Sequence, residues 1–332
     1  GVVRLLDQTA LPNKELFLEF STPGEIARAI TEMRIRGAPA IGVAAAYGFA
    51  ITALHYKHNV VGSDFVDAYW TLINSRPTAF NLKWALDRMW QVLEKHYDCE
   101  NLFQVLLDEA RMIHHETRES DIKLSNNGVK LIKSGSSVLT HCNTGALATA
   151  GYGTALGVIR MAYEIGRVKD VVVTETRPWM QGARLTMWEL GKLGIPSTLI
   201  VDSAAAHMMK VGMVGVVMVG ADRITSNGDV ANKIGTYSLA IISRQHGIPF
   251  YVVAPFSTID MSMLTGDDII IETRPATEIT QIGAVKTNLK PESVINLAFD
   301  VTPNEYITGI ITDRGIARPP YWKTLEALSR IE

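Results

Sequence analysis

The feature that most constrains the fold is a series of short, apolar, β-branched runs in the second half of the chain. Helical stretches separate five such runs, which are Ser137–Thr140, Asp170–Thr174, Ser197–Val201, Val214–Val219 and Phe250–Val253. Runs that are apolar throughout are typical of parallel strands buried on both faces. Strands that alternate with helices imply crossover connections. The second half is therefore expected to form an α/β domain with a doubly wound parallel sheet.

The first half of the chain has a different, mainly helical pattern. Residues 2–20 alternate loosely around a break at Leu11-Pro12-Asn13, which predicts a short β-hairpin. Thr22-Pro23-Gly24-Glu25 has the form of a helix start with Thr22 as the N-cap. Amphipathic helical patterns follow. We expect two domains, a mainly helical one over residues 1–125 and the sheet domain over residues 126–332.

Charge and composition exclude several classes of protein. The 32 basic and 34 acidic residues give a net charge of −2, with no long run of one sign, which disfavours a nucleic-acid or membrane surface. The most apolar stretch, residues 38–54, is rich in Ala and Gly and is expected to be a buried helix rather than a membrane span. No partner of either kind is expected.

The cysteine content indicates the compartment. Cys99 and Cys142 are the only cysteines, too few for a disulfide framework, which fits a reducing cytoplasm. No signal-peptide pattern opens the chain. Because the first residue is Gly1 rather than Met, we expect the native N-terminus to extend further.

Polar residues follow four of the five apolar runs. They are His141-Cys142-Asn143 after the first, Glu175-Thr176-Arg177 after the second, Asp202 after the third and Asp222 after the fourth. In doubly wound sheets, ligands bind beyond the carboxyl ends of the strands. We therefore expect a thiol, an arginine with a glutamate, and two aspartates at one edge of the sheet.

Each of these residues also has an ordinary structural explanation. A single cysteine after a strand is most often a small buried hydrophobe. Asp222 alone fits a helix cap or a turn, and Asp202 a helix start. His141 is expected to be a structural hydrogen-bonding residue rather than a base.

Motifs for cofactors are missing from the sequence. There is no phosphate-binding P-loop, and no GxGxxG opens the second domain, which disfavours a nicotinamide-linked dehydrogenase. No group of His, Cys, Asp or Glu has the spacing of zinc ligands. We expect neither a metal nor a cofactor.

The first half contains a candidate anion site. Arg36, Gly37 and Ala38 stand directly before a predicted helix whose first position is Pro39. Free N–H groups at a helix start, a flexible glycine and a guanidinium suit a phosphate. Arg76-Pro77-Thr78 also places an arginine directly before a predicted helix. The alternative is a surface arginine beside an ordinary cap.

Six stretches of the sequence together resemble one known family, that of the methylthioribose-1-phosphate isomerases of methionine salvage. They are RGAPAIGVAAAYG (36–48), SRPTAFN (75–81), THCNTGALAT (140–149), TETRPWMQ (174–181), GADRITSNGDVANKIGT (220–236) and AFDVTP (298–303). The stretches keep their order and run nearly end to end. The sequence departs from the family pattern at Leu297, where proline is expected, and at Thr273, where a second glutamate is usual.

The resemblance implies a Rossmann-like second domain, a homodimer and a small-molecule sugar phosphate as the substrate. It implies that Cys142 and Asp222 are catalytic. For substrate binding it implies Arg36, Gly37, Ala38, Arg76, Gln181, Asn232 and Lys233.

Two related functions remain as alternatives. Ribose-1,5-bisphosphate isomerases share the fold and a Cys/Asp pair, but they must hold a second phosphate. The regulatory subunits of a translation-initiation nucleotide-exchange factor share the fold as non-catalytic binding modules, which need neither Cys142 nor Asp222.

Overall fold

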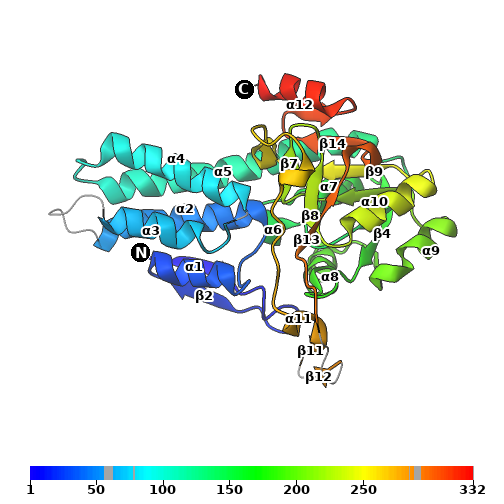
Figure 1. Cartoon of the computed structure of the whole chain (residues 1–332), viewed down its shortest axis with the longest axis horizontal. Helices are drawn as coiled ribbons and strands as arrows, with labels where there is room; N and C mark the ends of the chain where they lie inside the picture. Colours follow the sequence, from blue (N-terminus) through cyan, green and yellow to red (C-terminus); the bar gives the residue numbers. More distant parts are fainter. Residues whose placement is uncertain (56–62, 78, 284, 288–292, 332) are drawn as a thin grey trace. The chain divides into compact units, whose positions relative to one another are not determined.

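The computed structural model describes residues 1–55, 63–77, 79–283, 285–287 and 293–331 (Figure 1). The chain divides into two compact units. Unit 1 consists of residues 1–122 and 145–153, and unit 2 of residues 123–144 and 154–332. The chain therefore leaves unit 1, enters unit 2, and returns to unit 1 for one short segment. The domain boundary predicted between residues 125 and 126 stays a prediction.

Unit 1 consists of a β-hairpin and a group of helices. Its elements are β1 (Val3–Leu6), β2 (Phe17–Phe20), α1 (Pro23–Thr31), α2 (Ala38–His55), α3 (Ser63–Ile73), α4 (Phe80–His96), most of α5 (Leu102–Gly128) and α6 (Ala146–Thr149). β1 and β2 pair antiparallel, which confirms the predicted hairpin. The helix start at Thr22 is also confirmed. The Glu25 N–H donates to the Thr22 side chain, and the Glu25 carboxylate accepts from the Thr22 N–H.

Helix α2 is the centre of unit 1 and contacts α1, α3 and α4 (Figure 1). It is apolar all round, which is typical of a helix buried on every side. Gly42 allows α4 to approach closely, because a Cβ there would lie 2.9 Å from the carbonyl oxygen of Asn81. The prediction of a buried helix at residues 38–54 is confirmed. Within the described ranges, no helix is long and apolar enough to cross a membrane.

Unit 2 is built on a seven-stranded sheet in the order β15-β14-β9-β6-β3-β4-β5. The strands are β3 (Ser136–Thr140), β4 (Val168–Thr174), β5 (Ser197–Ile200), β6 (Val216–Val219), β9 (Phe250–Val253), β14 (Gly309–Thr312) and β15 (Gly315–Ala317). All neighbouring strands are parallel except β14 and β15. Counted along the chain, the six parallel strands lie in the order 3-2-1-4-5-6, that of the Rossmann doubly wound fold. The predicted fold class is confirmed.

Helices cover both faces of this sheet. They are α7 (Ala155–Glu164), α8 (Met187–Leu193), α9 (Ala205–Lys210), α10 (Thr236–Gln245) and α12 (Tyr321–Ser329). Successive strand residues belong to different apolar clusters: Leu139 packs with residues of α9, α10 and α12, and Val138 with residues of α7 and α8. Alternate residues of a strand point to opposite faces. The strand runs are therefore apolar throughout because each face has its own core.

A second, smaller sheet lies outside the sequence-based expectation. Its order is β10-β7-β8-β13, from β7 (Arg223–Thr225), β8 (Val230–Lys233), β10 (Ile259–Asp260) and β13 (Phe299–Thr302). β7 and β8 form a hairpin directly after β6. A short helix, α11 (Thr277–Thr280), and a small hairpin of β11 (Gln281–Ile282) and β12 (Val285–Lys286) complete the described elements.

Candidate active site

The two proposed chemical residues follow neighbouring strands of the main sheet. Cys142 comes two residues after β3, and Asp222 three residues after β6. β3 and β6 are paired in parallel, with Leu139 opposite Val217. The strand order reverses between β3 and β6, which is where doubly wound folds bind ligands. The sheet thus brings the thiol-bearing and carboxylate-bearing loops to the same edge, as the sequence predicted.

The backbone around Cys142 is held from both sides. Its N–H donates to Thr176 Oγ1 at 2.8 Å, and its carbonyl accepts from Thr186 Oγ1 at 2.5 Å. Cys142 has a φ of 63° and Thr176 one of 64°. Non-glycine residues in this left-handed region cost energy and cluster at functional sites. The neighbouring threonines fix Cys142, whose side chain is buried, in a conformation it would otherwise avoid.

His141 forms hydrogen bonds through both nitrogens of its ring. It is buried; its Nε2 lies 2.9 Å from the Ile234 carbonyl, and its Nδ1 lies 2.6 Å from Thr174 Oγ1. Burial lowers the pKa of this imidazole, which keeps it uncharged. Since the Ile234 carbonyl can only accept, Nε2 carries the hydrogen and Nδ1 accepts from Thr174. Both ring nitrogens are thus engaged, which supports the structural role predicted for His141.

Gln181 lies beyond β4, the other neighbour of β3. Its side chain is 1% exposed, and its Oε1 has no hydrogen-bond partner in the described part of the chain. The backbone after it runs very close to β4, because a Cβ on Gly182 would lie 1.8 Å from the Thr174 carbonyl oxygen. A buried amide oxygen without a partner is costly. Gln181 is therefore ready to accept a hydrogen bond from a ligand hydroxyl.

Asp202 stabilises the loop after β4. One carboxylate oxygen accepts from the Thr176 N–H and the other from the Arg177 N–H, both at 2.7 Å. The Arg177 guanidinium donates to the Pro178 and Ile279 carbonyls. Asp202, the other aspartate predicted at a strand end, therefore stabilises the backbone of this loop.

Asp222, Asn232 and Lys233 are linked through the β7–β8 hairpin. The Asp222 N–H donates to the Ala231 carbonyl at 2.9 Å, which ties the carboxylate-bearing turn to β8. Asn232 and Lys233 are the last two residues of β8, and Asn232 Nδ2 donates to Thr236 Oγ1 at 2.9 Å. The second sheet thus places the turn that carries Asp222 beside the strand that carries Asn232 and Lys233.

Asp300 is a residue that sequence reasoning did not single out, although it lies in the matched stretch 298–303. It stands opposite Asn232 in the β13–β8 pairing. Its two carboxylate oxygens accept from the Gly235 N–H at 2.7 Å and the Tyr237 N–H at 3.2 Å. Burial raises the pKa of Asp300 to about 6, and the two N–H groups and the charge of Lys233 oppose this rise. Its position in a short strand of a second sheet left no signal in the sequence.

In unit 1, Arg36, Gly37 and Ala38 lie at the start of α2. The helix begins at Ala38, one residue earlier than predicted, so Pro39 is its second residue. Gly37 has a φ of 99°, and a Cβ there would lie 2.3 Å from the carbonyl oxygen of Ala148 in α6. Only glycine fits at this position. The Arg36 side chain is buried, so the alternative of a surface arginine is wrong.

Arg76 lies in the turn that precedes α4. Its carbonyl accepts from the Ala79 N–H at 3.0 Å, and α4 begins at Phe80. Thr78, the third residue of the predicted turn, lies outside the described residues.

The proposed site residues are thus divided between the units. Cys142, Gln181, Asp222, Asn232 and Lys233 belong to unit 2, and Arg36, Gly37, Ala38 and Arg76 to unit 1. Within the described ranges, no group of three or more His, Cys, Asp or Glu side chains has a geometry that could hold a metal ion.

Comparison with known proteins gives consistent matches. Residues 34–319 match the family described as the initiation factor 2 subunit family. The methylthioribose-1-phosphate isomerase of Carboxydothermus hydrogenoformans is 52% identical over 327 residues, which covers 98% of this chain and 95% of that relative. The crystal structure of 5-methylthioribose 1-phosphate isomerase from Pyrococcus horikoshii OT3 has a TM-score of 0.91 and 43% identity, and covers 100% of this chain and 94% of that one.

A solved structure with another name is also similar. The translation initiation factor eIF-2B, subunit delta, from A. fulgidus has a TM-score of 0.85 and 40% identity, and covers 98% of this chain and 96% of that one. The fold and the identity over nearly the whole length together show that this chain belongs to the initiation factor 2 subunit family and, within it, to the methylthioribose-1-phosphate isomerases.

Proposed function

We propose that the chain converts methylthioribose 1-phosphate, an aldose, to methylthioribulose 1-phosphate, a ketose, as a step of methionine salvage. The observation that carries this proposal is the 52% identity to an isomerase of that name over 98% of the chain. The positions of Cys142 and Asp222 also support it, because their loops lie at the point where the strand order reverses. A non-catalytic binding module would need neither side chain.

The substrate sets the chemistry. A phosphate on C1 prevents the spontaneous ring opening that other aldose isomerases use, so the enzyme must break the bond between C1 and the ring oxygen. We assign Asp222, in its protonated form, to proton donation to the departing ring oxygen. The remaining step moves one hydrogen from C2 to C1 and leaves the overall composition unchanged.

Two routes accomplish that transfer. In the first, the Cys142 thiolate takes the C2 proton, the Cys142 thiol then protonates the resulting enol phosphate at C1, and the C2 hydroxyl gives its proton to the Asp222 carboxylate as the ketone forms. In the second, hydride moves directly from C2 to C1, and Cys142 and Asp222 handle only protons on oxygen. Substrate with deuterium at C2 distinguishes them in ordinary water, because hydride transfer keeps the label at C1 whereas the enol route exchanges it with solvent.

We assign the remaining residues to binding. Arg36 and Lys233 supply positive charge for the C1 phosphate, and the N–H groups at the start of α2 are suited to the same anion. The buried Gln181 Oε1 is suited to accept from a sugar hydroxyl. Gly37, Ala38, Arg76 and Asn232 complete the proposed set. The assignment needs no metal and no cofactor.

The decisive experiment compares two substrates. Purified protein is incubated with methylthioribose 1-phosphate and, separately, with ribose 1,5-bisphosphate, without added metal or nucleotide. A pocket for an apolar methylthio group loses binding energy when it receives a doubly charged phosphate, because that charge is desolvated without a partner. We expect a much higher kcat/KM for methylthioribose 1-phosphate. Comparable or reversed values would overturn the substrate assignment but not the isomerase class.

We further propose that the enzyme is a homodimer and works in the cytoplasm. The family resemblance supports the first statement, and the presence of only two cysteines, without a disulfide framework, supports the second. Light scattering during gel filtration tests the oligomeric state; a mass near 36.5 kDa, that of one chain, would contradict the dimer.

A further inference from the structure

Thr186 belongs to a helical turn that connects two of the proposed site residues. It ends a π-helical turn, Gly182–Thr186, in which hydrogen bonds span five residues rather than four. Gln181, which is proposed to bind the substrate, directly precedes this turn, and Thr186 itself donates a hydrogen bond to the Cys142 carbonyl. π-helical turns are rare and often lie at functional sites. The proposed reaction nevertheless gives Thr186 no role.

Three buried side chains form a chain of hydrogen bonds that ends at the Cys142 backbone. Asn143 Nδ2 donates to Glu189 Oε1 of α8 at 2.7 Å and to Thr186 Oγ1 at 3.3 Å. Thr186 Oγ1 in turn donates to the Cys142 carbonyl at 2.5 Å. A hydroxyl has one hydrogen, so Thr186 has none left to give to a substrate. Asn143 and Glu189 therefore orient a hydroxyl whose single hydrogen is directed at Cys142.

Thr176 holds Cys142 from the other side in the same way. Its Oγ1 accepts from the Cys142 N–H at 2.8 Å and donates to the Thr174 carbonyl at 3.1 Å. The two threonines thus bind both backbone polar groups of Cys142, and the hydrogen of each hydroxyl is already engaged. Neither hydroxyl is suited to transfer a proton in the reaction, so the contribution of both is to position Cys142.

The conformation of Cys142 explains why this residue needs to be held. Its φ of 63° lies in the left-handed region, which costs energy for a residue with a Cβ. Glycine adopts this region freely, but the proposed reaction requires a thiol at this position. A return to the ordinary φ of about −60° would turn the Cα–Cβ bond about the N–Cα axis by about 120° and move the thiol. The position of the thiol therefore depends on hydrogen bonds that offset the strain.

We propose that Thr186 is a positioning residue of the isomerase reaction, which holds Cys142 in its left-handed conformation and thereby keeps the thiol at the substrate. Asn143 and Glu189 contribute by orienting the Thr186 hydroxyl. The inference rests on the proposed function, because that proposal alone gives the Cys142 thiol a substrate. Since Thr186 acts through the thiol, its loss should lower the rate of turnover and leave the affinity for the substrate nearly unchanged.

Steady-state kinetics with methylthioribose 1-phosphate tests this proposal. Thr186→Val removes the hydroxyl and keeps the shape of the side chain. We expect kcat to fall about ten- to a hundredfold, the scale for a misplaced reacting group, and KM to stay within about threefold. Thr186→Ser, which keeps the hydroxyl, should recover most of the loss. Thr176→Val, which breaks the bond on the other side, should divide its effect between kcat and KM in the same way and provides a second, independent variant.

Thr312→Val is the matched control. Thr312 is also fully buried, and its Oγ1 accepts from the Arg314 N–H at 3.1 Å and donates to the Gly315 carbonyl at 2.9 Å. It is the last residue of β14, which lies three strands from β3 in the main sheet. This change should lower thermal stability about as much as Thr186→Val does and leave kcat unchanged.

Two further measurements show whether Thr186 acts through Cys142. In the Cys142→Ala background, Thr186→Val should leave the residual rate unchanged, because the effects of residues that act as a unit are not additive. A crystal structure of Thr186→Val should show the Cys142 φ outside the left-handed region. A normal kcat in Thr186→Val, an equal loss in Thr312→Val, a further loss in the Cys142→Ala background or an unchanged φ would each overturn the proposal. If the wild type does not turn over methylthioribose 1-phosphate, the proposed function fails, and the role of Thr186 in it fails as well.

Discussion

The two units hold their proposed site residues by opposite means. In unit 2, the Cys142 loop is fixed by side chains that are present, because Thr176 and Thr186 bind its N–H and its carbonyl. In unit 1, the Arg36 loop is fixed by close backbone packing. Gly37 has no side chain, so α6 can approach within a distance that no Cβ tolerates. The Cys142 loop thus depends on side-chain hydrogen bonds, and the turn proposed to bind the phosphate depends on close backbone packing. Substitutions should accordingly separate turnover from binding.

The largest expected effect is on turnover. Cys142→Ser and Asp222→Asn should each lower kcat by about 10²-fold or more, the scale of positioned proton transfer, while the fold is kept. Steady-state kinetics with circular dichroism checks this. Cys99→Ser, which changes the other cysteine, is the matched control and should retain activity. Near-normal kcat in either site variant would remove that residue from the chemistry.

Binding should respond to Arg36. Because this guanidinium is buried, Arg36→Ala should weaken phosphate-ester binding by about 1.5–3 kcal/mol, the range for a hydrogen bond to a charged group. The affinity for substrate is measured calorimetrically in the Cys142→Ser background, where turnover does not interfere. Arg28→Ala provides the same charge loss at an exposed position. Unchanged affinity in Arg36→Ala would refute its placement at the phosphate.

Stability should respond to Gly37. Gly37→Ala places a Cβ 2.3 Å from the Ala148 carbonyl oxygen, at a residue with a φ of 99°. We expect the free energy of unfolding to fall by about 1–3 kcal/mol or more. Urea denaturation measures it. Gly24→Ala in α1 is the contrast, because a Cβ there meets nothing within 4 Å and Ala favours helix. Equal effects of the two changes would show that the close approach to α6 is not what fixes the loop.

The last expected effect concerns pH. Because burial raises the pKa of Asp300 to about 6 from an ordinary 3.8, the folded protein binds this proton more tightly than the unfolded chain does. Asp300 therefore lowers stability as pH rises from about 4 to about 6, and its effect is constant above that window. Asp300→Asn should remove this slope. The difference in unfolding free energy between wild type and variant, followed from pH 4 to 7, should change only below about pH 6. A difference that stays constant throughout would contradict the raised pKa.

The elements that the sequence predicted are those with a local signal. The apolar runs before Cys142 and Asp222 became β3 and β6, and Thr22 with Glu25 formed a capping box, because patterning and capping act over a few residues. The family resemblance supplied Gln181 and Lys233, which no local pattern marked. The sequence analysis did not identify Asp300 or the second sheet, because strands such as β8 and β13 mix polar with apolar residues and form no continuous apolar run.

One long-range feature was also invisible. Nothing in the polar turn after Cys142 indicates that residues 145–153 belong to unit 1. The assignment depends on contacts across long separations, such as Gln8 Nε2 to the Leu147 carbonyl at 2.8 Å. The segment contains only the four-residue α6, and the longer α7 begins at Ala155 in unit 2.

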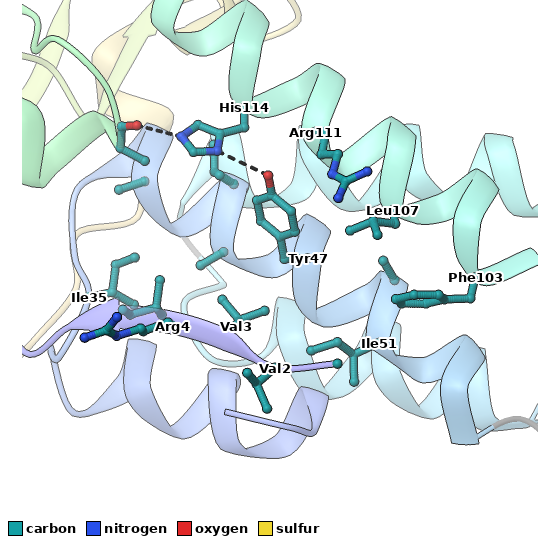
Figure 2. Close-up of a pocket in the computed structure, with 17 residues that line it drawn as sticks. Val2, Val3, Arg4, Ile35, Tyr47, Ile51, Phe103, Leu107, Arg111 and His114 are labelled. Atoms are coloured by element: carbon teal, nitrogen blue, oxygen red, sulfur yellow. Dashed lines mark hydrogen bonds between the residues drawn. The ribbon is translucent and has the colours of Figure 1, made fainter. Parts of the chain in front are cut away.

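The returning segment has a consequence for the order of synthesis. The buried carboxylate of Asp121 accepts from the N–H groups of Tyr152 and Gly153, and His114 bonds to the Ala150 carbonyl (Figure 2). A ribosome delivers the chain from its N-terminus, and domains generally fold as they emerge. Residues 145–153, which complete unit 1, are synthesised after β3 of unit 2. The helical unit can therefore be completed only when part of the main sheet has already been synthesised. Assembly of the two units during translation is therefore interleaved rather than sequential.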